Sequence, residues 1–230
     1  MAESAADIIK QFQEWAHWTT RALVLDTETT DLDGEVIELA IVQAWDGTVL
    51  FDERFRPRYP VSAGALAVHG ITDADLAGCG TFGEAWPRLR RQLASKGPLL
   101  IYNKVFDLGA MGRSLDCTLP DWYKNPDPAT SDVRTGDPYS ADHWLFYLIS
   151  WRAQCVMEAY APLAGMWSEW HGSYTWARLT AACEARGVDV SDLRAHSAVG
   201  DALATARLIQ ACAQLDPADF AYIGNEIQDE

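Results

Sequence analysis

The sequence is poor in positive charge: 18 Lys and Arg stand against 33 Asp and Glu, which gives a formal net charge of −15. Such a field repels polyanions, so the composition excludes a protein that coats nucleic acid by broad electrostatic attraction. An enzyme that meets phosphates through bound cations is still allowed, because clustered carboxylates are the ligands that hard cations require.

Long apolar runs and paired cysteines are also missing. The longest unbroken apolar run covers only 144–149, and a membrane span needs ~20 such residues, so we expect no membrane segment. The N-terminus has no apolar core that would mark a secretory signal. Five cysteines, an odd number without a CxxC pair, argue against a disulfide scaffold or zinc site. We therefore expect a reduced, cytoplasmic protein.

The chain contains no repeat and no low-complexity linker, and its 230 residues suit one domain over 1–230. Apolar patterning predicts strands over 21–26, 35–45, 48–55 and 99–103. It predicts helices over 4–18, 82–95, 106–115, 144–160, 174–186 and 197–213. A long irregular and helical insert is expected at about 116–172. Strands first and helices later indicate an α/β or α+β sheet flanked by helices.

Two acidic residues end the first predicted strand. Asp26 and Glu28 point to the same side, because strand side chains alternate with period two. Paired carboxylates repel unless a cation lies between them, so a divalent metal is one interpretation. A solvated strand end is the other.

Three further residues matter through their positions. Asp107 follows the strand at 99–103, where it can favour a helix N-terminus or carry function. Ser197 is a good N-cap for the last helix, which leaves His196 in the preceding loop and Asp201 in the helix. Each of these residues alone is weak evidence for a site.

Taken in order, these segments resemble the DnaQ-like 3′–5′ exonucleases of the DEDDh subgroup. The matching segments are Asp26-Thr27-Glu28-Thr29-Thr30, Val68-His69-Gly70-Ile71-Thr72, Asn103 with Phe106 and Asp107, and His196 with Ala198, Asp201 and Ala202. A sister subgroup has tyrosine where this chain has Ser197, so the histidine version is indicated. The resemblance runs from about Leu23 to Ile209.

The resemblance implies an α/β fold of the ribonuclease H-like type, a mixed five-stranded sheet with helices on both faces. It implies that four carboxylates bind two divalent ions, Mg²⁺ with Mn²⁺ as a substitute, and that His196 is the general base. These carboxylates are Asp26, Glu28, Asp107 and Asp201. It also implies substrate contacts by Thr27, Thr29, Leu32, His69 and Asn103; for Leu32, packing in a loop, and for His69, a role in a turn, are open alternatives.

The function implied is removal of nucleoside monophosphates from the 3′ end of DNA. A 3′–5′ exoribonuclease of the oligoribonuclease or RNase T type is the alternative, and a non-catalytic nucleic-acid-binding module is a third reading. The expected partner is nucleic acid with a 3′ end, single-stranded DNA first; a homodimer or a polymerase partner is open. Trp167 and Trp170 can stack on bases or pack; for Trp144, Trp151 and Trp176, in predicted helices, packing is favoured.

Overall fold

A five-stranded mixed sheet forms the centre of the molecule. The computed structural model describes residues 4–94, 96–118 and 138–223, without the side chains of 116–118 and 138–144. The strand order is β3-β2-β1-β4-β5, with β1 antiparallel to β2, β2 antiparallel to β3, and β1, β4 and β5 parallel. Their bounds are β1 Leu23–Thr29, β2 Val36–Gln43, β3 Val49–Arg54, β4 Leu99–Ile101 and β5 Ala153–Cys155. The mixed five-stranded sheet is confirmed.

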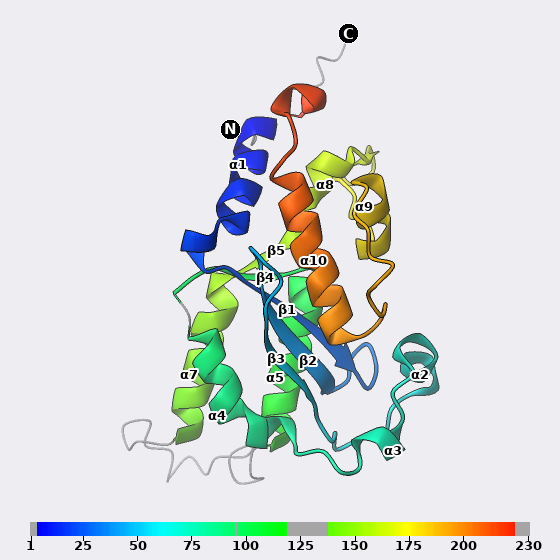
Figure 1. The fold of residues 1–230 in the computed structure, drawn as a ribbon. Helices are drawn as coiled ribbons and strands as arrows, with labels where there is room; N and C mark the ends of the chain where they lie inside the picture. The colour runs from blue at the N-terminus through cyan, green and yellow to red at the C-terminus, as the bar shows by residue number, and fades with distance from the viewer. Residues whose placement is uncertain (1–3, 95, 119–137, 224–230) are drawn as a thin grey trace.

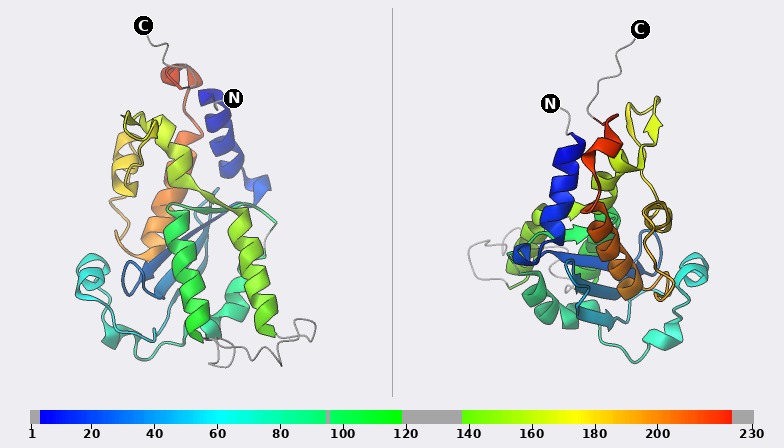
Figure 2. Two further views of the ribbon diagram at one scale, coloured as in Figure 1. Left: turned by 180° about the vertical axis from the view of Figure 1, so that it is seen from behind. Right: turned by 45° about the horizontal axis from the view of Figure 1, so that its top comes forward.

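Helices cover both faces of this sheet, as Figures 1 and 2 show. One face carries α1 Ala5–Ala16, α8 Val156–Ala164, α9 Leu179–Ala185 and α10 Ala198–Cys212. The other carries α4 Phe82–Leu93, α5 Lys104–Thr118 and α7 Pro138–Arg152. Strand alternation separates the two cores: Val24 packs with the α10 side, whereas Leu23 and Leu25 pack with the α4 and α5 side.

Short-range sequence features explain several of these boundaries. Asp46-Gly47 joins β2 to β3, with Gly47 in the left-handed region (φ 72°) that glycine tolerates. Ser197 caps α10 by accepting a hydrogen bond from the Gly200 N–H at 3.3 Å, as the sequence predicts. Between β3 and α4 lie two helices that the sequence analysis left unassigned, α2 Ala63–His69 and α3 Asp73–Leu76.

The predicted helix over 144–160 is wrong, because β5 interrupts it and pairs in parallel with β4. A strand of three residues between two helices shows no readable period-two pattern. The helix predicted from 174 begins at Leu179, and the loop at 161–172 contains the end of α8 and strand β6 Trp167–Ser168, which pairs with β7 Ser173–Tyr174. Much of the irregular segment 116–143 lies outside the described residues.

The described part of the chain bears on two expectations, those for membrane segments and for disulfides. No helix there is long and apolar enough to cross a membrane. Cys79, Cys155, Cys183 and Cys212 are free thiols, and the side chain of Cys117 lies outside the described residues. Two 3₁₀ helices, η1 Trp18–Thr20 and η2 Pro217–Phe220, complete the described elements.

Candidate active site

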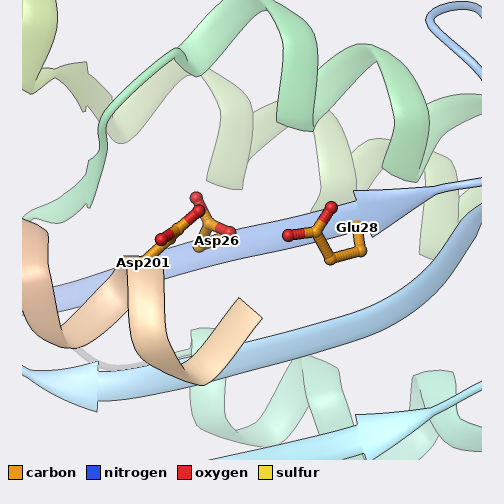
Figure 3. A group of neighbouring side chains, drawn as sticks. All are labelled: Asp26, Glu28 and Asp201. Atoms are coloured by element: carbon orange, nitrogen blue, oxygen red, sulfur yellow. The ribbon is translucent and has the colours of Figure 1, made fainter. Parts of the chain in front are cut away.

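Three carboxylates meet where the central strand faces α10. Asp26 and Glu28 of β1 and Asp201 of α10 each offer an oxygen, and these oxygens lie within 4.8 Å of one another. Figure 3 shows the strand and the first turn of the helix directing these side chains toward one another. Residues 24, 26 and 28 share the face that α10 covers, so strand alternation and the Ser197 cap together place the cluster.

Asp107 reaches the same place from the other face of the sheet. It lies in the first turn of α5, is 3% exposed, and accepts hydrogen bonds from the Thr27 N–H at 2.9 Å and the Thr27 hydroxyl at 2.7 Å. These two bonds fix one carboxylate oxygen against β1.

All five residues predicted to be catalytic line one small cavity of about 170 Å³. The lining consists of Asp26, Thr27, Glu28, Tyr102, Asn103, Phe106, Asp107, Leu179, His196 and Asp201. The structure therefore brings together side chains that come from β1, α5 and the start of α10.

Burial and mutual repulsion shift the acid equilibria of this cluster. Burial, opposed by the bonds from Thr27, raises the pKa of Asp107 to about 7. Burial and then the neighbouring carboxylates raise the pKa of Glu28 to about 8 and hold that of Asp26 well above its ordinary value. Burial also raises the pKa of Asp201. An oxygen-only set of crowded carboxylates fits hard divalent cations, which would remove this repulsion.

The metal-free protein should lose stability as the pH rises from about 5 to 8. Across this pH window, a carboxyl group with a raised pKa keeps its proton in the folded state but has lost it in the unfolded state. The window extends to about pH 8, because the pKa of Glu28 is raised to about 8. Unfolding then becomes more favourable at higher pH. Mg²⁺ or Mn²⁺ should raise the melting temperature, and more at pH 8 than at pH 5, because ions bind the deprotonated carboxylates.

Thermal denaturation with EDTA and with each ion, at both pH values, measures this effect. Asp201→Asn is the matched variant, since it removes one carboxylate and should flatten both dependences. A metal-free melting temperature that rises toward pH 8, or no response to either ion at pH 8, would contradict the cation site.

His196 occupies the loop immediately before α10 and has an unusual backbone. Its φ is 55°, in the left-handed region that costs a non-glycine residue ~1–3 kcal/mol. The side chain is exposed and lines the cavity. Burial has the largest effect on the pKa of Asp201 and raises it. The charge of the His196 imidazole and, to a smaller extent, a hydrogen bond from the His196 backbone lower it. The imidazole thus stands beside the carboxylates without being buried among them.

Of the residues expected to bind substrate, some line the cavity and others lie outside it. Thr27 and Asn103 line the cavity, although the Thr27 hydroxyl is committed to Asp107. Thr29 is buried, and its hydroxyl donates to the Asp31 carbonyl at 2.7 Å. Leu32 lies beyond the end of β1 and is 78% exposed, so its side chain is available to a ligand.

His69 is used internally. The Ile71 N–H donates to His69 Nδ1 at 2.9 Å, so Nε2 carries the proton and donates to the Thr29 carbonyl at 3.2 Å. Burial lowers the pKa of this imidazole, which keeps it neutral. A substrate contact by His69 would have to replace one of these two bonds.

The sequence analysis missed Glu38, which links three elements behind the cluster. It lies opposite Glu28 in the β1–β2 ladder and is 5% exposed. Glu38 accepts from Arg54 Nε at 2.8 Å and from the Ala198 N–H, the first residue of α10, at 2.9 Å. An acid inside the apolar strand VIELAIV is a signal that could have found it, because such a residue needs a partner.

Glu38→Ala should destabilise the fold by about 2–3 kcal/mol. Removing one partner of a buried ion pair costs ~3–5 kcal/mol, and the 35% exposure of the Arg54 side chain reduces that loss. Urea denaturation measures the change. Glu53→Ala, which removes an exposed pair with Arg88, is the control and should cost at most ~1 kcal/mol. Equal, small losses in both variants would contradict a linking role for Glu38.

The exposed tryptophans lie mostly away from the cluster. Trp167 packs edge-on against Tyr174, and the Tyr174 ring lies 6.4 Å from that of Tyr222. Tyr222 follows η2, beyond the C-terminal end of α10, whereas Asp201 lies in the first turn of that helix. Trp170 is 91% exposed. The packing predicted for Trp151 and Trp176 is wrong, since they are 82% and 62% exposed. Trp176 lies ahead of α9 rather than in a helix, and the side chain of Trp144 lies outside the described residues.

The sheet has the ribonuclease H-like arrangement, and the comparisons with known proteins indicate the class of the hydrolytic exonucleases; the carboxylate cluster between β1 and α10 could hold a divalent cation. More narrowly, residues 23–120 match the model of the exonuclease family RNase_T. The matched region contains Asp26, Glu28 and Asp107. His196 and Asp201 lie beyond it, and the structure brings them to the same cavity.

One relative is similar to this chain in sequence, and two solved structures are similar to it in fold. An uncharacterized exonuclease, CP81, of Escherichia phage 186 is 26% identical over 220 residues, 93% of this chain and 98% of the phage protein. Exonuclease X in complex with 5′-overhanging duplex DNA matches with a TM-score of 0.52 and 23% identity, over 88% of this chain and 98% of that one. E. coli exonuclease I with a dA16 oligonucleotide matches with a TM-score of 0.57 and 20% identity, over 87% of this chain and 42% of that one. Other curated relatives are matched over 14% to 40% of their length.

Proposed function

We propose that this protein is a metal-dependent 3′–5′ exonuclease that removes nucleoside monophosphates from the 3′ end of DNA, single-stranded DNA first. The observation that carries the proposal is the convergence of Asp26, Glu28, Asp107, Asp201 and His196 around one cavity. The chain as a whole is the unit that acts, since β1, α5 and α10 all contribute.

The four carboxylates would hold two divalent cations, Mg²⁺ or Mn²⁺, through oxygen atoms alone. When bound, such a pair stabilises charge on the attacking and leaving oxygens of an in-line displacement. Asp107 is held by Thr27, so its free oxygen keeps a fixed direction. The hydrogen bond from the Ala198 N–H to Glu38 holds the start of α10, the helix that presents Asp201.

His196 is the proposed general base. It accepts the proton of the attacking water, which cleaves the last phosphodiester bond and releases a nucleoside 5′-monophosphate. Exposure of the ring at the cavity lets it reach a water and return the proton to solvent. Leu32, Asn103 and the backbone around Thr27 and Thr29 are the proposed contacts to the terminal nucleotide.

Digestion of matched 5′-labelled single-stranded DNA, duplex DNA and RNA, with Mg²⁺ or with EDTA, tests the proposal. We expect a ladder of shortening labelled products with Mg²⁺ and none with EDTA, fastest on single-stranded DNA. The solved complexes of exonucleases X and I with DNA make DNA the first substrate to test. Early release of a labelled mononucleotide would reverse the polarity, and preference for RNA would favour an exoribonuclease.

A further inference from the structure

Arg194 is an arginine fixed at the edge of the acidic cluster. It lies two residues before His196, and its carbonyl accepts the Ser197 hydroxyl at 2.8 Å. A Cβ on Gly200 would lie 2.1 Å from the same carbonyl, so the first turn of α10 packs directly on Arg194. The backbone of Arg194 is therefore positioned by the same helix start that presents Asp201.

The side chain of Arg194 is exposed and retains most of its donors. One terminal nitrogen donates to the His69 carbonyl at 3.1 Å. Among residues 4–94, 96–118 and 138–223, no carboxylate lies within ion-pairing distance of it, in contrast to Arg54, Arg88 and Arg207. A guanidinium has five N–H groups, so one hydrogen bond leaves the others free for a ligand.

Its charge acts on the cluster. Burial and the neighbouring carboxylates raise the pKa of Glu28. The positive charge of Arg194 has a smaller effect and lowers this pKa. Arg194 does not line the cavity that the four carboxylates share. The cation thus lies near the carboxylate cluster and outside the cavity that the four carboxylates share.

We propose that Arg194 binds the substrate-strand phosphate next to the one that is cleaved. The proposal rests on the exonuclease function proposed above. It explains how a chain with a net charge of −15 can bind a polyanion at the edge of its acidic cluster. An arginine fork matches phosphate geometry and forms charge-assisted hydrogen bonds with it. Anchoring by the His69 carbonyl and by the start of α10 fixes the direction from which the fork approaches.

Binding of a fluorescent single-stranded oligonucleotide tests the proposal, measured in an Asp201→Asn background so that cleavage does not interfere. Arg194→Gln should weaken binding about 10- to 100-fold, and Arg194→Lys, which keeps the charge but not the fork, should restore only part of it. The slope of log affinity against log salt should become shallower by about 0.7, the value for one lost phosphate contact on a single strand. Arg91→Gln should change neither quantity.

Arg91 is a matched control because it is also exposed and donates to a backbone carbonyl, that of Pro87 at 3.1 Å. It lies beside Leu23, at the end of β1 away from the cluster, and its removal changes the net charge equally.

A methylphosphonate next to the scissile phosphate separates contact from positioning. Neutralising that phosphate should weaken wild-type binding as much as Arg194→Gln does, and the two changes together should cost little more than either alone. Losses that multiply, or an unchanged salt slope, would overturn the proposal and leave Arg194 as a support for His69. A strand that binds through Arg194 in the parent protein but is not cleaved by it would overturn the exonuclease function and retain the contact.

Discussion

Asp201→Asn is expected to lower the hydrolysis rate about 10³-fold or more. A divalent cation contributes several kcal/mol to the stabilisation of transition-state charge, and each 1.36 kcal/mol is a factor of ten in rate. The asparagine keeps the shape of the side chain but removes a charged ligand from a set whose oxygens lie within 4.8 Å of one another. Steady-state cleavage of a labelled oligonucleotide across a Mg²⁺ titration measures the loss.

The same loss is expected for Asp26→Asn, Glu28→Gln and Asp107→Asn. Each of these variants should stay folded, and without metal at pH 8 each should melt at or above the wild-type temperature, because one source of repulsion is gone. Asp52→Asn is the control, since Asp52 is an exposed strand carboxylate on β3. A variant with near-normal rate and normal Mg²⁺ dependence would show that its residue is not a ligand.

His196→Ala is expected to lower the rate by about 10²–10⁴, the range for loss of a general base. The imidazole lines the cavity beside Asp201 and offers no oxygen to a cation, so cation binding should survive the substitution. A protonated imidazole cannot accept a proton, so the wild-type rate should fall in acid more steeply than that of the variant. Rates from pH 5 to 9, with ion binding followed by melting temperature, measure both effects.

The backbone at His196 calls for a second variant. His196→Asn tolerates a positive φ better than alanine, so a similar rate loss in both variants would exclude backbone strain as the cause. His171→Ala, in the exposed turn between β6 and β7, is the matched histidine control. An unchanged rate and pH profile in His196→Ala would remove this residue from the mechanism.

The sequence predicted those parts of the site that depend on local pattern. Asp26 and Glu28 share a side because strands alternate, and Ser197 is recognisable as a cap. Glu38 could not be assigned a role, because its partners Arg54 and Ala198 approach from β3 and α10 and only the folded sheet brings them together. His69 was open between substrate and turn, since its two hydrogen bonds involve backbone groups, which composition does not reveal.

The fold shows the same division. Strands β1 to β4 each contain an unbroken apolar run of at least three residues, whereas β5 has a polar residue, Gln154, at its centre and pairs in parallel with the edge of β4. The exposure of Trp151, at 82%, shows that a tryptophan in a largely apolar helix need not face the core. Which side chains of α7 face the core depends on the part of the sheet that α4 and α5 leave uncovered. The spacing of apolar residues along the sequence does not contain this information.

The docking of α10 has a consequence for synthesis of the chain. Asp26 is made 175 residues before Asp201, and the two meet only when α10 packs on β1 and β2. Such distant contacts close late, because the entropy of a large loop must be overcome before they form. A nascent chain would therefore hold its first carboxylates without Asp201 until α10 has been made, and the carboxylate set is complete only when this helix has packed on the sheet.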